Sequence, residues 1–189
     1  GRSYIFIIFS RKLQKSGCNV RYECPNLLES HFVFDRLRAF QFATLWSTAL
    51  IKHREKLKPE VVWNIERGLS LDATQLIDAE RKRSEIRLNM IDFLNKYEFL
   101  ITPTAPVAPP PYEERYVKSI EGVETQSYID WLALGYAISV TGCPSVSIPC
   151  GFTSDGLPVG IQIVSLPHRE VALLSFAAWI EQVFELDIG

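Results

Sequence analysis

The sequence predicts an α/β fold in which a mixed β-sheet is flanked by α-helices. The first half holds long segments with apolar residues at helical spacing, and two short segments rich in β-branched residues follow late in the chain. The chain has 189 residues, of which 47% are hydrophobic, as is usual for a globular protein. We therefore expect one domain over residues 1–189.

The amino-terminal residues 4–9 leave two interpretations open. Their β-branched and aromatic side chains favour a strand, whereas the residues that follow equally fit the end of a helix with Gly17 as its cap. Residues 18–24 alternate enough to predict a short strand, which Pro25 ends.

Residues 27–57 contain neither proline nor glycine and predict a long helix. Large apolar side chains recur there every three to five residues, so we interpret them as core rather than as a ligand site. These residues are Leu28, Phe32, Leu37, Phe40, Leu45 and Trp46.

Two more helices are predicted in the first half of the chain. Pro59 suits the first turn of a short helix to Arg67, which Gly68 ends in a left-handed conformation. Asp72 fits the N-cap of a long helix whose charged run, residues 80–85, forms a solvated face. We expect its buried stripe to consist of Ala73, Leu76, Ile77, Leu88, Ile91 and Leu94.

Residues 99–101 predict a short buried strand that leads into a proline-rich excursion, residues 103–127. Five prolines between residues 103 and 111 forbid helix and ladder pairing, so the chain is extended there. The segment is either a rigid surface linker of polyproline type or a strap that fixes the end of the strand beside a functional cleft.

The last part of the chain predicts a β-hairpin and a terminal helix. Residues 145–150 and 157–165 alternate like half-buried strands, and Asp155 and Gly156 between them both tolerate the positive φ of a hairpin turn. Residues 170–184 carry apolar side chains on one helical face.

Composition excludes several classes of function. The net charge of −2 and the pI of about 6.0 argue against a nucleic acid partner. The longest apolar run has six residues, so we expect no membrane anchor or membrane partner. Four cysteines without a CxxC spacing and three scattered histidines predict no metal site, and we expect no cofactor. Reduced thiols fit a cytoplasmic protein.

No catalytic motif stands out. The chain has no GxSxG elbow, no SxxK, no P-loop and no GxGxxG. Residues 128–140 have helical character that Gly135 interrupts, and a loop with Thr141, Gly142 and Cys143 follows. The loop position of Cys143 invites interpretation as a nucleophile, but inert packing is the favoured interpretation because nothing indicates an activated thiolate.

Three segments carry a family resemblance. They are YEFLITPTAPVAPPP (97–111), YIDWLALGYAISVTGCPSVSIPCGF (128–152) and DGLPVGIQIVSLPHREVALLSFAAWIE (155–181). In order and spacing they resemble the carboxyl-terminal third of the amidase signature enzymes. The resemblance extends from about Leu57 to the end, whereas residues 1–12 match nothing in it and are of doubtful origin.

The resemblance implies a partial amidase-like domain without its reacting groups. Enzymes of that family hydrolyse or transfer carboxamide groups with a serine nucleophile, a second serine in a cis peptide and a lysine, all upstream of the matched part. We therefore expect no catalytic residue here, and an amino-terminal region of the same fold as partner. By resemblance, Trp131 lines the acyl pocket of a small-molecule amide, and Thr141, Gly142 and Cys143 lie near the active centre.

Two hypotheses follow from that resemblance. The chain is either the carboxyl-terminal part of an amidase-like hydrolase of carboxamide C–N bonds or a noncatalytic structural or binding remnant of that fold. Because the late strands are apolar enough to be buried on both faces, we expect the isolated chain to expose apolar surface and to self-associate.

Overall fold

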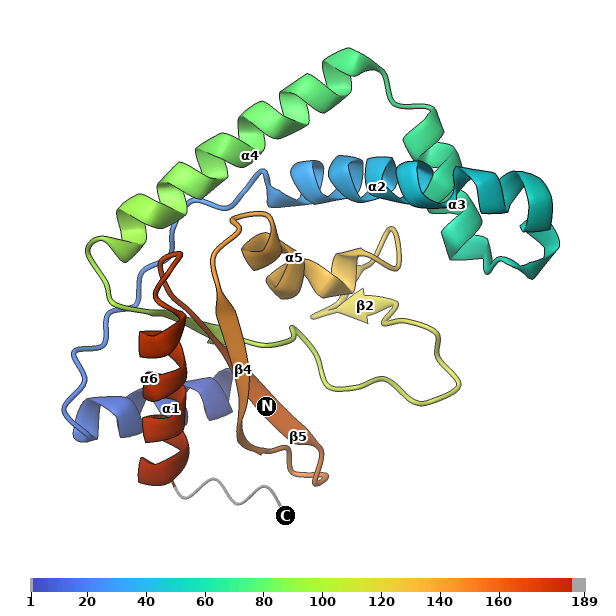
Figure 1. Cartoon of the computed structure of the whole chain (residues 1–189). Helices are drawn as coiled ribbons and strands as arrows, with labels where there is room; N and C mark the ends of the chain where they lie inside the picture. Colours follow the sequence, from blue (N-terminus) through green and yellow to red (C-terminus); the bar gives the residue numbers. More distant parts are fainter. Residues whose placement is uncertain (1, 185–189) are drawn as a thin grey trace.

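Figure 1 shows the computed structural model of the protein, in which residues 2–184 are described. The helices are α1 (Arg2–Lys15), α2 (Ser30–His53), α3 (Pro59–Leu69), α4 (Ala73–Leu94), α5 (Ala133–Ser139) and α6 (Glu170–Val183), with 3-10 turns η1 (Arg54–Lys56) and η2 (Asp130–Leu132). The strands are β1 (Leu100–Pro103), β2 (Ser119–Ile120), β3 (Val123–Glu124), β4 (Ser145–Phe152) and β5 (Pro158–Val164). From the long helix α2 onward the predicted order of helices and strands is confirmed, except that β2 and β3 were not predicted.

Strands β1, β5 and β4 form one sheet in that order. β4 and β5 make the predicted hairpin, and β1 pairs with the other edge of β5. We expected a mixed sheet, but both pairings are antiparallel. The central strand β5 runs opposite to both of its neighbours. A second, two-stranded hairpin of β2 and β3 lies within the proline-rich excursion.

The turn between β4 and β5 is longer than the two-residue turn expected from Asp155 and Gly156. Of these two residues only Gly156 has a positive φ, of 79°. The Thr153 N–H donates to the Leu157 carbonyl (2.8 Å), and the Gly156 N–H donates to the Thr153 carbonyl (3.0 Å). A left-handed glycine thus closes a wider loop.

One face of the sheet is apolar and is closed by α1 and α6. Ile148, Ile161 and Ile163 are buried there, as their alternation predicts. The same cluster contains Phe9 and Leu13 of α1 and Leu173, Ala177 and Ile180 of α6. The first segment is therefore helical, with Gly17 at φ 93° after its end, and it packs as part of the core.

The opposite face changes character along the strands. Near Leu100 and Val164 it is apolar and packs against side chains of α4 and α5. Further along, Thr102, Gln162 and Ser147 are neighbours in register and form a polar row. Because Thr102 and Gln162 are only half-buried and Ser147 is exposed, this face is not the fully apolar one that we expected.

The short strand expected at residues 18–24 is wrong. The segment has no regular structure and pairs with no strand of the described chain. Cys18 and Val20 instead pack against the edge of the apolar cluster between the sheet and α6. Their alternation therefore reflects partial burial of a coil segment rather than ladder pairing.

α2 and α3 form an antiparallel helical hairpin on the side away from α1 and α6 (Figure 1). α3 ends two residues beyond the expected Arg67, and the expected left-handed cap at Gly68 is wrong, because Gly68 lies inside α3 and has no positive φ. A Cβ atom there would lie 2.0 Å from the Ala39 carbonyl oxygen, so glycine is needed for close helix packing.

Burial in α2 follows small residues rather than large ones. Val33, Ala39 and Ala43 are buried because they face the neighbouring helices at close range. The interpretation of the large apolar residues as core is therefore wrong for four of them, which are exposed: Leu28, Phe40, Leu45 and Trp46.

The predicted N-cap of α4 is confirmed, but of its predicted buried stripe only Leu94 is fully buried. Asp72 and Gln75 form a capping box, with the Gln75 N–H donating to Asp72 Oδ1 (2.8 Å) and the Asp72 N–H donating to Gln75 Oε1 (3.0 Å). Ile77 and Leu88 are exposed because the side of α4 that meets α2 and the sheet is a different one. That side buries Ala79, Ile86, Met90 and Leu94.

The excursion starts as a continuation of the sheet. The Thr104 N–H donates to the Gly160 carbonyl (3.1 Å), and the Thr104 and Ser147 hydroxyls are 2.7 Å apart. This attachment favours the strap interpretation for its first residues. After the excursion, α5 continues through Gly135 without the expected interruption, since the residue lies within the helix.

Candidate substrate-binding region

The turn after α5 contains three of the four residues that we expected near the active centre. The Thr141 hydroxyl donates to the Ile138 carbonyl (2.6 Å) and accepts the Cys143 N–H (3.1 Å). Gly142 has a φ of 67°, and its N–H donates to the Ser139 carbonyl (3.2 Å). The turn is thus fixed by its own hydrogen bonds, which occupy the N–H groups of Gly142 and Cys143.

Solvent exposure separates these three residues. Thr141 is fully buried, and Cys143 is buried in the apolar cluster between the sheet and α4. Gly142 alone among them reaches solvent. The burial of Cys143 among apolar side chains agrees with the packing interpretation of this thiol.

Two arginines on α4, one helical turn apart, hold the same turn from outside. Arg87 Nη1 donates to the Thr141 carbonyl (3.1 Å), and Arg83 Nε donates to the Val140 carbonyl (3.4 Å). A Cβ atom at Gly142 would lie 2.6 Å from Arg87 Nη1, so glycine leaves room for the guanidinium group. These carbonyls lie at the carboxyl end of α5, where positive charge is favourable.

Trp131, the fourth expected residue, lies in η2 at the opposite end of α5 and is half-buried. The seven residues of α5 place it roughly 10 Å along the helix from the turn. The structure therefore does not gather the four residues into one cluster. It places them at the two ends of one short helix.

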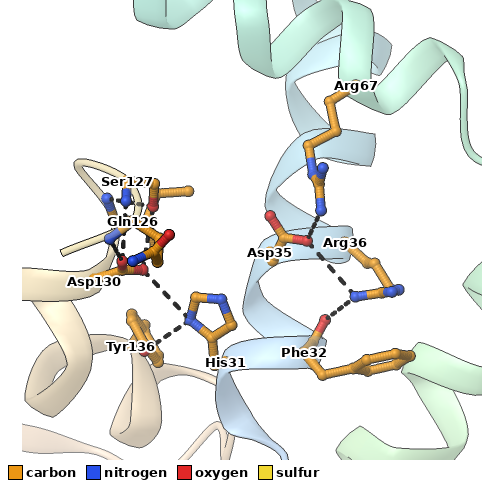
Figure 2. Close-up of polar contacts among 10 residues, drawn as sticks. His31, Phe32, Asp35, Arg36, Arg67, Gln126, Ser127, Asp130 and Tyr136 are labelled. Atoms are coloured by element: carbon orange, nitrogen blue, oxygen red, sulfur yellow. Dashed lines mark hydrogen bonds and ion pairs between the residues drawn. The ribbon is translucent and has the colours of Figure 1, made fainter. Parts of the chain in front are cut away.

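Asp130 organises the end of α5 where η2 lies (Figure 2). Its carboxylate accepts the N–H groups of Gln126 (2.6 Å) and Ser127 (3.0 Å), and Oδ1 lies 3.9 Å from His31 Nδ1. His31 Nδ1 is 3.0 Å from the Tyr136 hydroxyl. Burial, and then the charge of Asp130, raise the pKa of Tyr136, so its phenol stays protonated and links α5 to α2.

An open cavity of about 490 Å³ lies between α2, α4 and the end of α5. Phenylalanine and leucine side chains of α2 line one side, and Arg38, Glu80 and Arg83 add charged groups. Ser139 and Val140 also line it, and they come directly before the turn. A small molecule held in this cavity would therefore lie beside the turn.

Among residues 6–184, whose side chains are described, no hydrogen bond joins a serine hydroxyl to a histidine or lysine nitrogen. The serine hydroxyls that form hydrogen bonds do so with backbone groups, carboxylates or other hydroxyls. In this part of the chain no group of three or more metal-ligating side chains is present, and no helix is long and apolar enough to cross a membrane.

The sequence analysis missed the two arginines: it placed Arg83 in the solvated run of residues 80–85 and gave Arg87, just after that run, no role. That prediction holds for most of the run, which is exposed. The overlooked signal is the spacing of Arg83 and Arg87 with Met90 and Leu94, which places all four on one helical face. Both arginines are exposed, but they lie on the same helical face as the buried Met90 and Leu94, and their guanidinium groups reach the Val140 and Thr141 carbonyls.

Comparison with known proteins decides the family. The family model described as Amidase matches residues 20–174, most of the chain. The chain belongs to the amidase signature family. An acylamidase from Rhodococcus erythropolis is 30% identical over 125 residues, which are 66% of this chain and 25% of that protein. A fatty acid amide hydrolase from Arabidopsis thaliana is 28% identical over 120 residues, which are 60% of this chain and 19% of that protein.

Solved structures of amidase signature proteins share this fold. An amidase crystal structure with 25% identity has a TM-score of 0.87, covering 95% of this chain and 41% of its own. A bacterial aryl acylamidase of the family, 18% identical, has a TM-score of 0.84 over 95% of this chain and 39% of its own. The chain thus spans a quarter or less of these two curated relatives and about two fifths of the solved structures.

Proposed function

We propose that this chain is the carboxyl-terminal part of an amidase signature enzyme that hydrolyses carboxamide C–N bonds of small molecules. The carrying observation is that nearly the whole chain superposes on less than half of an amidase, at a TM-score of 0.87. The absence of a serine paired with a base within the described residues supports the same view. The serine nucleophile, the second serine and the lysine would then come from an amino-terminal region of the same fold.

The contribution of this chain would be to shape the substrate site. Gly142 presents an exposed backbone at the turn, while Thr141 and Cys143 hold the turn in place from within. The adjoining cavity is partly apolar and carries charged groups, which suits an amide with an apolar acyl part and a polar end. Trp131 would bound the acyl part from the other end of α5.

The turn is not suited to stabilise the oxyanion of the reaction. A tetrahedral intermediate needs free N–H donors aimed at the developing negative oxygen. The Gly142 and Cys143 N–H groups already donate to the Ser139 carbonyl and the Thr141 hydroxyl. We therefore assign oxyanion stabilisation, like the nucleophile, to the amino-terminal region.

Ammonia release from simple primary amides tests this function. We expect none from the purified chain, and turnover when a longer protein that carries the upstream region is used. Within that longer protein, Trp131→Ala should raise KM for amides with large acyl groups more than for acetamide. Turnover by the chain alone would contradict the assignment of the reacting groups.

The remnant hypothesis predicts a different result. If the longer protein binds amides, seen as a shift in its melting temperature, but never releases ammonia, the chain is a noncatalytic remnant of the fold.

A further inference from the structure

The side chain of Tyr128, just after the proline-rich excursion, contacts both helices of the α2–α3 hairpin. Asn64 Nδ2 of α3 donates to the Tyr128 hydroxyl (2.5 Å), and Arg38 Nη2 of α2 donates to the same oxygen (3.1 Å). The Trp63 ring lies edge-on to the Tyr128 ring, with 6.3 Å between the centroids. The Arg38 guanidinium group lies 5.7 Å from the centroid of the Tyr128 ring. The hairpin therefore fixes both the ring and the hydroxyl of Tyr128.

The amide of Asn64 makes this contact from a buried position. Asn64 is 1% exposed, and its Nδ2 also donates to the Glu60 carbonyl (2.7 Å). Exchanging the amide nitrogen and oxygen would place two acceptors against each other at Glu60, so the orientation of the amide is determined. Both N–H groups of Asn64 Nδ2 are thus used. Without the Tyr128 hydroxyl, one buried N–H group would lose its acceptor, which is unfavourable.

Two polar contacts connect the excursion and the residues after it to α3. Arg115 pairs with Glu60 (2.7 Å), but the Arg115 side chain is 61% exposed, so water weakens this pair. The contact of Tyr128 with Asn64 is the buried one of the two. The carboxylate of Asp130 accepts backbone N–H groups of its own turn and does not reach α3. Tyr128 is therefore the main polar connection between this turn and α3.

Trp131 lies one turn after Tyr128, in η2. The Leu132 N–H donates to the Ile129 carbonyl (2.9 Å), which is the i to i+3 hydrogen bond of a 3-10 turn. Side chains three residues apart in such a turn lie on the same side of it. Fixing Tyr128 therefore also restricts the positions that are open to Trp131.

We propose that Tyr128 is a positioning residue that holds Trp131 in place beside the acyl part of the substrate. The proposal rests on the proposed function, in which Trp131 bounds that part. Tyr128 acts through Trp131 and needs no contact with the substrate. A side chain that is already held in place loses little conformational freedom when a large acyl group packs against it, so binding is tighter. Acetamide, whose acyl part ends in one methyl group, gains little from such a contact.

Amide hydrolysis by the longer protein that carries the upstream region tests the proposal. Tyr128→Phe removes the hydroxyl and keeps the ring. It should raise KM for amides with large acyl groups roughly three- to tenfold, the scale of one net hydrogen bond, and change kcat and the KM for acetamide less than about twofold. A merely structural role would lower kcat for all amides in parallel, because less of the protein would be folded. Circular dichroism compares the folded fraction of each variant.

Asn64→Leu tests whether the buried hydrogen bond carries the effect. Leucine has no N–H group that could be left without an acceptor, so Tyr128→Phe combined with Asn64→Leu should have no higher KM than Tyr128→Phe alone. Tyr112, a tyrosine of the excursion that is 99% exposed, provides the matched control. Tyr112→Phe should leave every KM unchanged. A higher KM in the double variant, or the same increase in Tyr112→Phe, would contradict the proposal.

The 189-residue chain allows a second test that needs no activity. The chain has four tryptophans, and replacing three by phenylalanine leaves Trp131 alone; the three are Trp46, Trp63 and Trp179. Tyr128→Phe in this background should raise the acrylamide quenching constant of Trp131 roughly twofold, because a less restrained side chain meets solvent more often. Turnover by the longer protein with either an unchanged quenching constant or an unchanged KM would overturn the role of Tyr128 alone. No turnover of any amide would overturn the proposed function, and the role of Trp131 with it.

Discussion

The sheet side of the molecule and its helical side use the same kind of apolar side chain with different outcomes. In β5, Ile161 and Ile163 were predicted to be buried and are buried. In the helical side formed by α2, α3 and α4, Leu45 and Ile77 were predicted to be buried and are exposed. A strand has only two faces, and α1 and α6 of this chain pack against one of them.

The difference teaches that periodicity predicts burial only where the covering partner is known. A helix surface points in many directions, and large apolar residues on α2 and α4 exceed the neighbours that the described chain offers them. In an amidase signature enzyme of which this chain spans a part, such residues are where the remaining chain would pack. Matched substitutions on the two sides should therefore differ in their effect on stability.

Replacing one isoleucine by alanine on each side should give the largest difference in the free energy of unfolding. Ile163→Ala removes a fully buried side chain from the sheet core and should lower the free energy of unfolding by about 3–4 kcal/mol. Ile77→Ala changes a residue that is 70% exposed, so a change within about 0.5 kcal/mol is expected. Urea denaturation of both variants measures the two values. Equal losses would show that the helical side buries Ile77 in the folded protein, for example by self-association.

Two glycines test close packing on the helical side. A Cβ atom at Gly68 would overlap the Ala39 carbonyl, so Gly68→Ala should force α2 and α3 apart and cost at least about 2 kcal/mol. Gly135 in α5 has no atom within 4 Å of such a Cβ. Gly135→Ala should therefore stabilise the protein by roughly 0.5–1 kcal/mol through helix propensity. Thermal unfolding followed by circular dichroism compares them, and destabilisation by both substitutions to the same extent would refute the packing argument.

Local sequence signals predicted most of the helices and strands. The exceptions depend on which elements pack against each other. The capping box at Asp72 and the hairpin glycine at Gly156 depend on residues a few positions away, so the sequence alone reveals them. Gly68 resembles a helix end in the sequence because glycine favours both caps and close contacts. Only the position of α2 shows which of the two applies.

The candidate site was predicted in the same uneven way. Family resemblance located Thr141, Gly142 and Cys143, which form one turn, but it gave no distance to Trp131, which α5 separates from them. Arg87 was given no role in the sequence analysis, although its spacing places it on the helical face of the buried Met90; in the structure it is exposed and its guanidinium group reaches the Thr141 carbonyl.

Arg87 connects α4 on the helical side to the turn that precedes β4 of the sheet. We expect its substitution to cause an intermediate loss of stability. Arg87→Ala removes the donor to the Thr141 carbonyl and should cost about 1–2 kcal/mol, because a hydrogen bond from a charged group to the carbonyl of a buried residue is lost. Arg81, on the same helix, is 70% exposed in its side chain and pairs only with Asp78. Arg81→Ala should cost less than about 0.5 kcal/mol. Amide exchange at Gly142 should speed up in the first variant alone, and unchanged exchange there would contradict a positioning role for Arg87.

The smallest effect on stability is expected from the thiol of Cys150 in β4, on the sheet side. The helical side offers no matched residue, because α2, α3 and α4 contain no cysteine. Burial raises the pKa of Cys150 from near 9 to about 11. The folded state therefore favours the protonated thiol, and this contribution is complete below pH 9 and lost as the pH rises toward about 11. Unfolding free energies from pH 8 to 10.5 should fall more steeply for the wild type than for Cys150→Ala. The difference should stay below about 1 kcal/mol because water partly screens the thiol. Parallel pH profiles would show that the thiol ionises equally easily in the folded and unfolded protein.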